Sequence, residues 1–419
     1  MKQRIIATAL SGALAVLALP SASAAETAYR VLRSFGLKTD AQSPSDGVLA
    51  GNGGTLFGVA KKGGLNLQGT VFAINPASGS EKQLYSFGSG TIGKQSALFG
   101  PIVDKSNPPP DYALALNRAG TTLYGVTRDG GKHGLGTVFT IDVKTGQRTV
   151  VYSFTGGVKD GGHPNSPLTL SPKGMLYGTT SRGGERKLGT VYRLSPNGTP
   201  TAIYAFTPVS TSAPPYFSVY EPIGRLAVSS YGVVYGTTAL GGADGKGTVY
   251  KLYPPTDKSA VYTATVLHSF RGGNDGTDPV GGVVLNATQT TLYGVTTRGG
   301  SADKGTAYAC STEGKARVVH SFLGRDGGDG SYPSSGLTVD KADMLYGTTH
   351  SGGTLGKGTV FALDPSTGNE IVMHQFGGQA NGDGQSPNGT LIITAAGDLV
   401  GTTSSGGAND TGTVFVLPR

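Results

Sequence analysis

The sequence predicts an all-β protein, a seven-bladed β-propeller built from four-stranded antiparallel blades. Three observations support this prediction. One phrase recurs seven times along the 419-residue chain, each copy contains four short runs of strand character, and the two ends of the chain complement each other.

The recurring phrase starts with an aromatic residue and Gly, passes through a Gly-Gly pair, and ends in Gly-Thr-Val followed by a second aromatic residue. Its first residue recurs at intervals of 53 to 67 residues, at Phe57, Tyr124, Tyr177, Tyr235, Tyr293, Tyr346 and, in the seventh copy, Val400. A repeat of this length indicates a chain of equivalent structural units, as in solenoids and propellers.

The strands within one repeat are clearest in the third copy, at residues 167–171, 175–180, 190–194 and 201–206. Short turns rich in Gly, Pro and Asn separate them. Such turns join neighbouring antiparallel strands, so each copy is expected to form a four-stranded meander. A single small sheet cannot bury enough surface alone, and packing several sheets around an axis solves that problem.

The closure of the ring is predicted by the two ends of the chain. The fourth strand of a copy ends in a triplet such as Tyr152-Ser153-Phe154, but the seventh copy stops at Arg419 without one. Residues 29–35 have the sequence of that missing strand, with no copy in front of them. We therefore expect the N-terminal strand to complete the last blade. An open β-solenoid is the alternative, but its repeats are shorter and a split last repeat would serve no purpose there.

Residues 1–24 have the features of a secretory signal peptide: the basic residues Lys2 and Arg4, an apolar run over residues 5–19, and a cleavage site of small residues, Ala22-Ser23-Ala24. A membrane anchor is the alternative, but a span needs about 20 apolar residues. We expect a secreted or periplasmic protein in which residues 25–419 form one monomeric propeller domain. The single cysteine, Cys310, excludes an internal disulfide and is expected to be buried.

The net charge argues against nucleic acid as a partner. Removal of Lys2 and Arg4 with the leader lowers the formal charge from +8 to +6. That weak bias is spread over the whole mature chain and forms no basic cluster.

The whole phrase, Leu-Tyr-Gly-Thr-Thr, Gly-Gly, Gly-Thr-Val-Phe and a strand ending in Ser-Phe, resembles the GloVer tandem repeat of secreted bacterial proteins. The resemblance covers essentially the whole mature chain. It implies a propeller fold and an extracytoplasmic location, and it implies no catalytic residue.

Two sets of loops are expected to share one face of the propeller. Because strands in a meander alternate in direction, the Gly-Gly loops and the loops between blades lie at the same end. Binding candidates in the Gly-Gly loops are Arg128, Arg182, Arg298 and His350. Two insertions between blades add the aromatic candidates Tyr112, Tyr216 and Phe217, although neutral variation in loop length is the alternative.

The loops between blades also contain acidic segments that could bind calcium. The candidate ligands are Asp275, Asp278, Asp326 and Asp329, because Ca²⁺ prefers several carboxylate and carbonyl oxygens. The alternative is turn chemistry, in which Asp and Gly supply side-chain-to-backbone bonds and positive φ angles. His268, His320 and His374 recur at one position, but equivalent positions in neighbouring blades should lie on the order of 15 Å apart, too far for one shared zinc ion.

The sequence contains no nucleophile elbow, zinc-protease motif or phosphate-binding loop. No catalytic residue is assigned, and no cofactor other than the possible structural Ca²⁺. The leading hypothesis is a non-enzymatic propeller that binds a protein or glycan partner through its loop-rich face. An extracellular polysaccharide-active hydrolase or lyase is the alternative, and a structural surface component is a third hypothesis.

Overall fold

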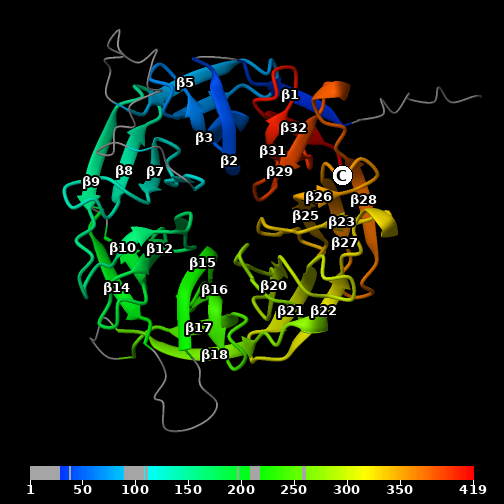
Figure 1. The fold of residues 1–419 in the computed structure, drawn as a ribbon. Helices are drawn as coiled ribbons and strands as arrows, with labels where there is room; N and C mark the ends of the chain where they lie inside the picture. Colours follow the sequence, from blue (N-terminus) through cyan, green and yellow to red (C-terminus); the bar gives the residue numbers. More distant parts are fainter. Residues whose placement is uncertain are drawn as a thin grey trace, which may run out of the picture.

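The computed structural model describes residues 29–36, 39–88, 108, 112–195, 198–207, 218–256 and 261–419, the side chains of 218–220 excepted. The expected signal peptide and the candidates Tyr216 and Phe217 lie outside these residues. The strands form seven blades arranged in a ring around a central axis (Figure 1). The predicted seven-bladed propeller of antiparallel blades is therefore confirmed.

Each blade is an antiparallel meander that runs from the strand nearest the axis to the outermost strand. Blade 1 comprises β2 (Ala41–Ala50), β3 (Leu56–Gly63), β4 (Thr70–Ile74) and β5 (Glu81–Ser86). Blade 2 comprises β6 (Ala115–Leu116), β7 (Thr122–Thr127), β8 (Thr137–Asp142) and β9 (Arg148–Ser153). Blade 3 comprises β10 (Gly162–Pro164), β11 (Thr169–Leu170), β12 (Leu176–Arg182), β13 (Thr190–Leu194) and β14 (Pro200–Ala205).

The second half of the ring repeats this plan. Blade 4 comprises β15 (Ser218–Val228), β16 (Val234–Gly242), β17 (Thr248–Tyr253) and β18 (Thr263–Ser269), and blade 5 comprises β19 (Val283–Leu285), β20 (Thr291–Thr296), β21 (Thr306–Ser311) and β22 (Ala316–Ser321). Blade 6 comprises β23 (Gly330–Ser331), β24 (Thr338–Val339), β25 (Leu345–Thr349), β26 (Ser351–Gly352), β27 (Thr359–Leu363) and β28 (Glu370–Gln375). Blade 7 comprises β29 (Gly384–Pro387), β30 (Ile392–Ile393), β31 (Leu399–Gly406), β32 (Thr413–Leu417) and β1 (Arg30–Ser34).

The ring is closed by the N-terminal strand, as the sequence predicted. Strand β1 pairs antiparallel with β32, with Arg30 opposite Val416 and Ser34 opposite Thr413. Figure 1 shows the first and last strands of the chain side by side in one blade. The described residues contain no helix that is long and apolar enough to cross a membrane.

The repeated phrase encodes contacts inside each blade. In six blades the last Thr of the second strand and the first Thr of the third strand share a buried hydrogen bond of 2.8 or 2.9 Å, as between Thr349 and Thr359. The phrase also pairs Gly with an aromatic residue across the two strands, as Gly347 with Phe361. A Cβ at Gly347 would lie 2.5 Å from that ring, so the close packing requires glycine there.

The hydrophobic core lies between the blades and is not a single central cluster. Each blade's outermost strand is followed by a buried Phe that packs edge-on against an aromatic of the next blade, as Phe322 does against Phe361 at 5.2 Å between ring centroids. Cys310 is fully buried in the cluster between blades 4 and 5, as expected, and burial raises the pKa of its thiol to about 11. The thiol is therefore protonated and unreactive at neutral pH.

Three buried tyrosines, at 192, 250 and 308, have hydroxyls without a hydrogen-bond partner among the described residues, whereas the equivalent residue of other blades is Phe.

Replacing Tyr308 by Phe is expected to raise the free energy of unfolding by about 1 kcal/mol, because it removes an unsatisfied buried donor. Urea denaturation measures the change. The same replacement at Tyr152, whose hydroxyl donates to Asp160 at 3.0 Å, should lower stability instead. Equal effects at both positions would contradict this explanation.

Candidate functional site

The Gly-Gly loops and the loops between blades do lie on the same face of the ring. Backbone hydrogen bonds join the two sets directly, from Gly184 to Gly157, from Gly300 to Gly273 and from Gly353 to Asp329, at 2.8 to 3.1 Å. We call this side of the propeller the loop face.

A cavity of about 300 Å³, the axial cavity, lies where the innermost segments of the blades meet. All seven blades contribute to its lining, for example through Asp46, Tyr112, Asn165, Arg225, Gly281, Ser335 and Asn388. The cavity therefore exists only in the closed ring, since no single repeat encloses it.

The sequence of the repeat explains why this cavity is lined irregularly. In six blades a Pro near the start of the blade, the blade-starting Pro, packs on the Gly of the preceding blade's Gly-Thr-Val segment, as Pro387 does on Gly358. Residues just after the Pro line the cavity, and they differ from blade to blade: Ser45 and Asp46, Asn165, residues 223–225 (Ile-Gly-Arg), and Asn388 with Thr390. The repeat is constant where blades pack and variable where they meet the axis.

Three charged residues, Asp46, Lys61 and Arg225, line the axial cavity. Asp46 has a left-handed backbone with φ of 56° and accepts a hydrogen bond of 3.0 Å from the Ala113 backbone N–H. Burial raises the pKa of Asp46, against the opposing effects of Arg225, Ala113 and Lys61. The Nε atom of Arg225 is buried and has no hydrogen-bond partner in the part of the chain that the structure describes. The cavity thus combines one carboxylate with two cationic side chains.

A second recurring arrangement, the interblade clamp, organises the loops between blades. A residue of the outermost strand contacts an Asp in the loop that leads to the next blade, at distances of 2.6 to 3.1 Å. The described pairs are Arg33–Asp40, Tyr152–Asp160, His268–Asp275, His320–Asp329 and His374–Asp383. Each Asp also accepts a backbone N–H from its own loop, as Asp383 does from Gly377 at 2.7 Å. The recurring histidines are therefore parts of separate clamps, in line with the distance argument against one shared metal ion.

The predicted binding residues occupy different parts of the loop face. Tyr112 lines the axial cavity, whereas Arg128, Arg182, Arg298 and His350 are exposed on the Gly-Gly loops and do not line it. Their role in binding stays a prediction.

The candidate calcium ligands are also distributed among different environments. Asp275 and Asp329 belong to interblade clamps, Asp278 precedes the Pro that starts blade 5, and Asp326 is exposed in the 3-10 turn η3 (Arg325–Gly327). These contacts agree with turn chemistry for Asp275 and Asp329, and calcium binding stays a prediction.

Sequence reasoning missed Asp46, Arg225 and Glu370, and it did not single out Lys61 from the basic Gly-Gly loops. For Asp46 and Arg225 a signal was available, because they break the internal repeat at the positions that follow the blade-starting Pro. That these positions converge on one cavity became visible only in the assembled ring.

The profile of the Gloeobacter/Verrucomicrobia repeat matches residues 101–262 and 221–418. No curated protein sequence matches the chain. Among solved structures, an oligogalacturonate lyase from Vibrio parahaemolyticus aligns with a TM-score of 0.56 and 10% identity over 93% of this chain and 92% of that chain. An oligogalacturonate lyase in complex with manganese aligns with a TM-score of 0.54 and 11% identity over 94% and 97%. A gluconolactonase from Xanthomonas campestris aligns with a TM-score of 0.44 and 16% identity over 93% and 88%. At these identities the likeness is one of fold alone.

Proposed function

The chain belongs to the Gloeobacter/Verrucomicrobia repeat family, and we propose that it is a secreted, non-enzymatic propeller that binds the end of a glycan in its axial cavity. In this proposal residues 1–24 direct export, and the loop face meets the partner. The observation that carries it is the buried Nε of Arg225, which has no hydrogen-bond partner among the described residues, in a cavity lined by all seven blades.

The size and lining of the axial cavity suit a small polar ligand. Its volume of about 300 Å³ lies at the lower end of the range for ligand sites, which favours a single terminal sugar residue over an extended chain. Asn165, Ser335 and Asn388 can exchange hydrogen bonds with hydroxyls. The guanidinium of Arg225 can donate to a hydroxyl or, more strongly, to the carboxylate of an acidic sugar.

The non-enzymatic part of the proposal rests on the composition of the lining. Among the described residues that line the cavity, Asp46 is the single carboxylate and none is His. Most glycoside hydrolases use a pair of carboxylates. An acid without such a partner, in the same cavity as Arg225, is better suited to orient a ligand than to cleave it.

The test is binding of neutral and uronic-acid oligosaccharides to the mature protein, measured by calorimetry. Arg225→Ala is expected to weaken binding of the best acidic fragment by about tenfold or more, because it removes a charged hydrogen bond in a buried site. Arg118→Ala is the matched control. Arg118 is exposed in a turn between first and second strands, on the opposite face, so binding should not change.

Two outcomes would overturn the proposal. If no fragment binds, or if Arg225→Ala binds as tightly as the natural chain, the axial cavity is not the glycan site. Mass spectrometry of the fragments after incubation separates binding from cleavage. Shortened fragments would replace the binding role with that of a polysaccharide-active hydrolase or lyase.

A further inference from the structure

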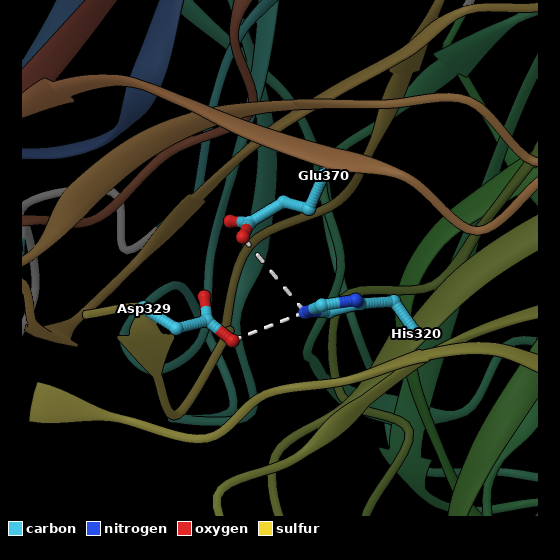
Figure 2. A group of neighbouring side chains, drawn as sticks. All are labelled: His320, Asp329 and Glu370. Atoms are coloured by element: carbon cyan, nitrogen blue, oxygen red, sulfur yellow. Dashed lines mark hydrogen bonds and ion pairs between the residues drawn. The ribbon is translucent and has the colours of Figure 1, made fainter. Parts of the chain in front are cut away.

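One of the histidine clamps contains a second carboxylate. His320 lies on β22 of blade 5, Asp329 lies in the loop that leads to blade 6, and Glu370 is the first residue of β28, the outermost strand of blade 6. The Nε2 atom of His320 lies 3.1 Å from a carboxylate oxygen of Asp329 and 3.9 Å from one of Glu370. Figure 2 shows both carboxylates turned toward the imidazole. Across the described part of the chain, this is the one group of three such residues whose ligating atoms lie within 4.8 Å of one another.

Glu370 is the unusual member of this group. Its side chain is only 9% exposed, and its Oε1 atom has no hydrogen-bond partner among the described residues. Burial and the charge of Asp329 raise the pKa of Glu370 to about 8. A carboxyl group this buried is normally protonated, paired with a cation or bound to a metal ion, because an unpaired buried charge is costly.

The clamp between blades 7 and 1 shows how the same geometry is neutralised elsewhere. There Glu81, also the first residue of an outermost strand, takes the position of Glu370. One guanidinium nitrogen of Arg33 lies 2.6 Å from Asp40 and 3.2 Å from Glu81, and Glu81 also accepts the Ala41 backbone N–H. Two carboxylates are thus bridged by a permanent cation.

The two other histidine clamps lack the second carboxylate. Next to His268 the equivalent position is Ala316, the first residue of β22. Next to His374 the N-terminal segment supplies Tyr29, which stacks on the imidazole at 3.5 Å and donates a hydrogen bond to Asp383. Only the clamp of His320, within the described residues, combines an imidazole with two carboxylates and has no arginine between them.

We propose that His320, Asp329 and Glu370 bind one divalent transition metal ion, with Zn²⁺ as the best match, and so link blade 5 to blade 6 on the loop face. Zinc binds imidazole nitrogen and carboxylate oxygen at 2.0 to 2.2 Å, which in a tetrahedron places ligand atoms about 3.3 Å apart. The observed 3.1 and 3.9 Å lie on either side of that spacing. Three protein ligands leave the fourth position for water.

Two further features suit a metal site. A hydrogen bond between the His320 ring and the Gly368 backbone orients the imidazole, as is usual for histidine ligands. The His320 side chain is 18% exposed, so an ion can reach it from solvent. Calcium fits less well, because it prefers six to eight oxygen ligands.

The test uses the mature full-length protein without an affinity tag, after removal of metal with EDTA. Titration with ZnCl₂ is expected to fill one site per chain and to raise the melting temperature, since the ion binds the folded ring. Glu370→Gln and His320→Gln should each weaken Zn²⁺ binding by about tenfold or more, as losing a ligand costs at least what losing a supporting residue does. Millimolar Ca²⁺ should not displace the Zn²⁺.

His268→Gln is the matched control, because it breaks the same kind of clamp one blade earlier, where Ala316 stands in place of the glutamate. Its Zn²⁺ affinity should equal that of the natural chain. The proposal fails if the natural chain takes up no Zn²⁺, if Glu370→Gln binds it unchanged, if His268→Gln weakens binding as much as His320→Gln, or if Ca²⁺ displaces the ion. Should His320→Gln not fold, Glu370→Gln and the visible spectrum of bound Co²⁺ decide the matter.

Discussion

Deletion of residues 25–36 is expected to prevent the mature chain from folding into a stable ring. Strand β1 is the outermost strand of blade 7, and its flanking aromatics reach both neighbouring blades. Phe35 is fully buried against Phe72 of blade 1, and Tyr29 packs against His374 of blade 6. Losing two such aromatics at about 3 to 5 kcal/mol each, plus the β1–β32 hydrogen bonds, amounts to about 10 kcal/mol. That is comparable with the whole stability of a typical protein.

Circular dichroism and thermal melting of the truncated chain test this expectation. A circular permutant is the matched control, with residues 29–36 placed after Arg419 through a copy of the turn at 364–369, which joins β27 to β28. The permutant should melt close to the natural protein, because every contact of β1 is restored. A truncated chain that melts cooperatively at the natural temperature would show that the N-terminal strand is dispensable.

Phe322→Ala is expected to lower the free energy of unfolding by about 3 to 5 kcal/mol. The ring is fully buried between blades 5 and 6, where it packs edge-on against Phe361 at 5.2 Å and His320 at 4.9 Å. Removing it leaves a cavity between two rigid sheets, which cannot collapse to fill it.

Urea denaturation of the two chains measures that loss. The control is Ile371→Ala on the outer strand of blade 6, where the side chain is 62% exposed, and the change should stay within about 0.5 kcal/mol. A loss below about 1 kcal/mol for Phe322→Ala would mean that the aromatic contacts between blades are not the main source of the ring's stability.

Much of the fold could be predicted because the same contacts within a blade require the same residues in every copy of the repeat. The Gly and the aromatic residue of the phrase lie opposite each other on paired strands, as Gly347 and Phe361 do, and each blade needs this pair again. The N-terminal strand could be assigned to the last blade because residues 29–35 share the pattern of the other outermost strands. The observed strand limits differ from the predicted ones by a few residues where loop residues also pair with a strand. In the third copy, for example, β10 comprises Gly162–Pro164 and precedes the predicted first strand at residues 167–171.

The candidate sites were harder to predict because their residues are far apart in the chain. Asp46 and Arg225 come from blades 1 and 4, and nothing in either repeat indicates that both face the axial cavity. His320, Asp329 and Glu370 span two blades, and the position of Glu370 looks like an ordinary solvent-facing strand residue in the sequence.

The sequence by itself determined the number of blades, their four-stranded form, the closure by the first strand and the face that carries the loops, because each follows from periodic local patterns. Only the tertiary structure decided which irregular residues meet at the axis and which clamp contains a second carboxylate. The physical reason is that packing between blades repeats and can be read from one copy. The sites instead arise where residues that depart from the repeat, in different copies, are brought within bonding distance by closure of the ring.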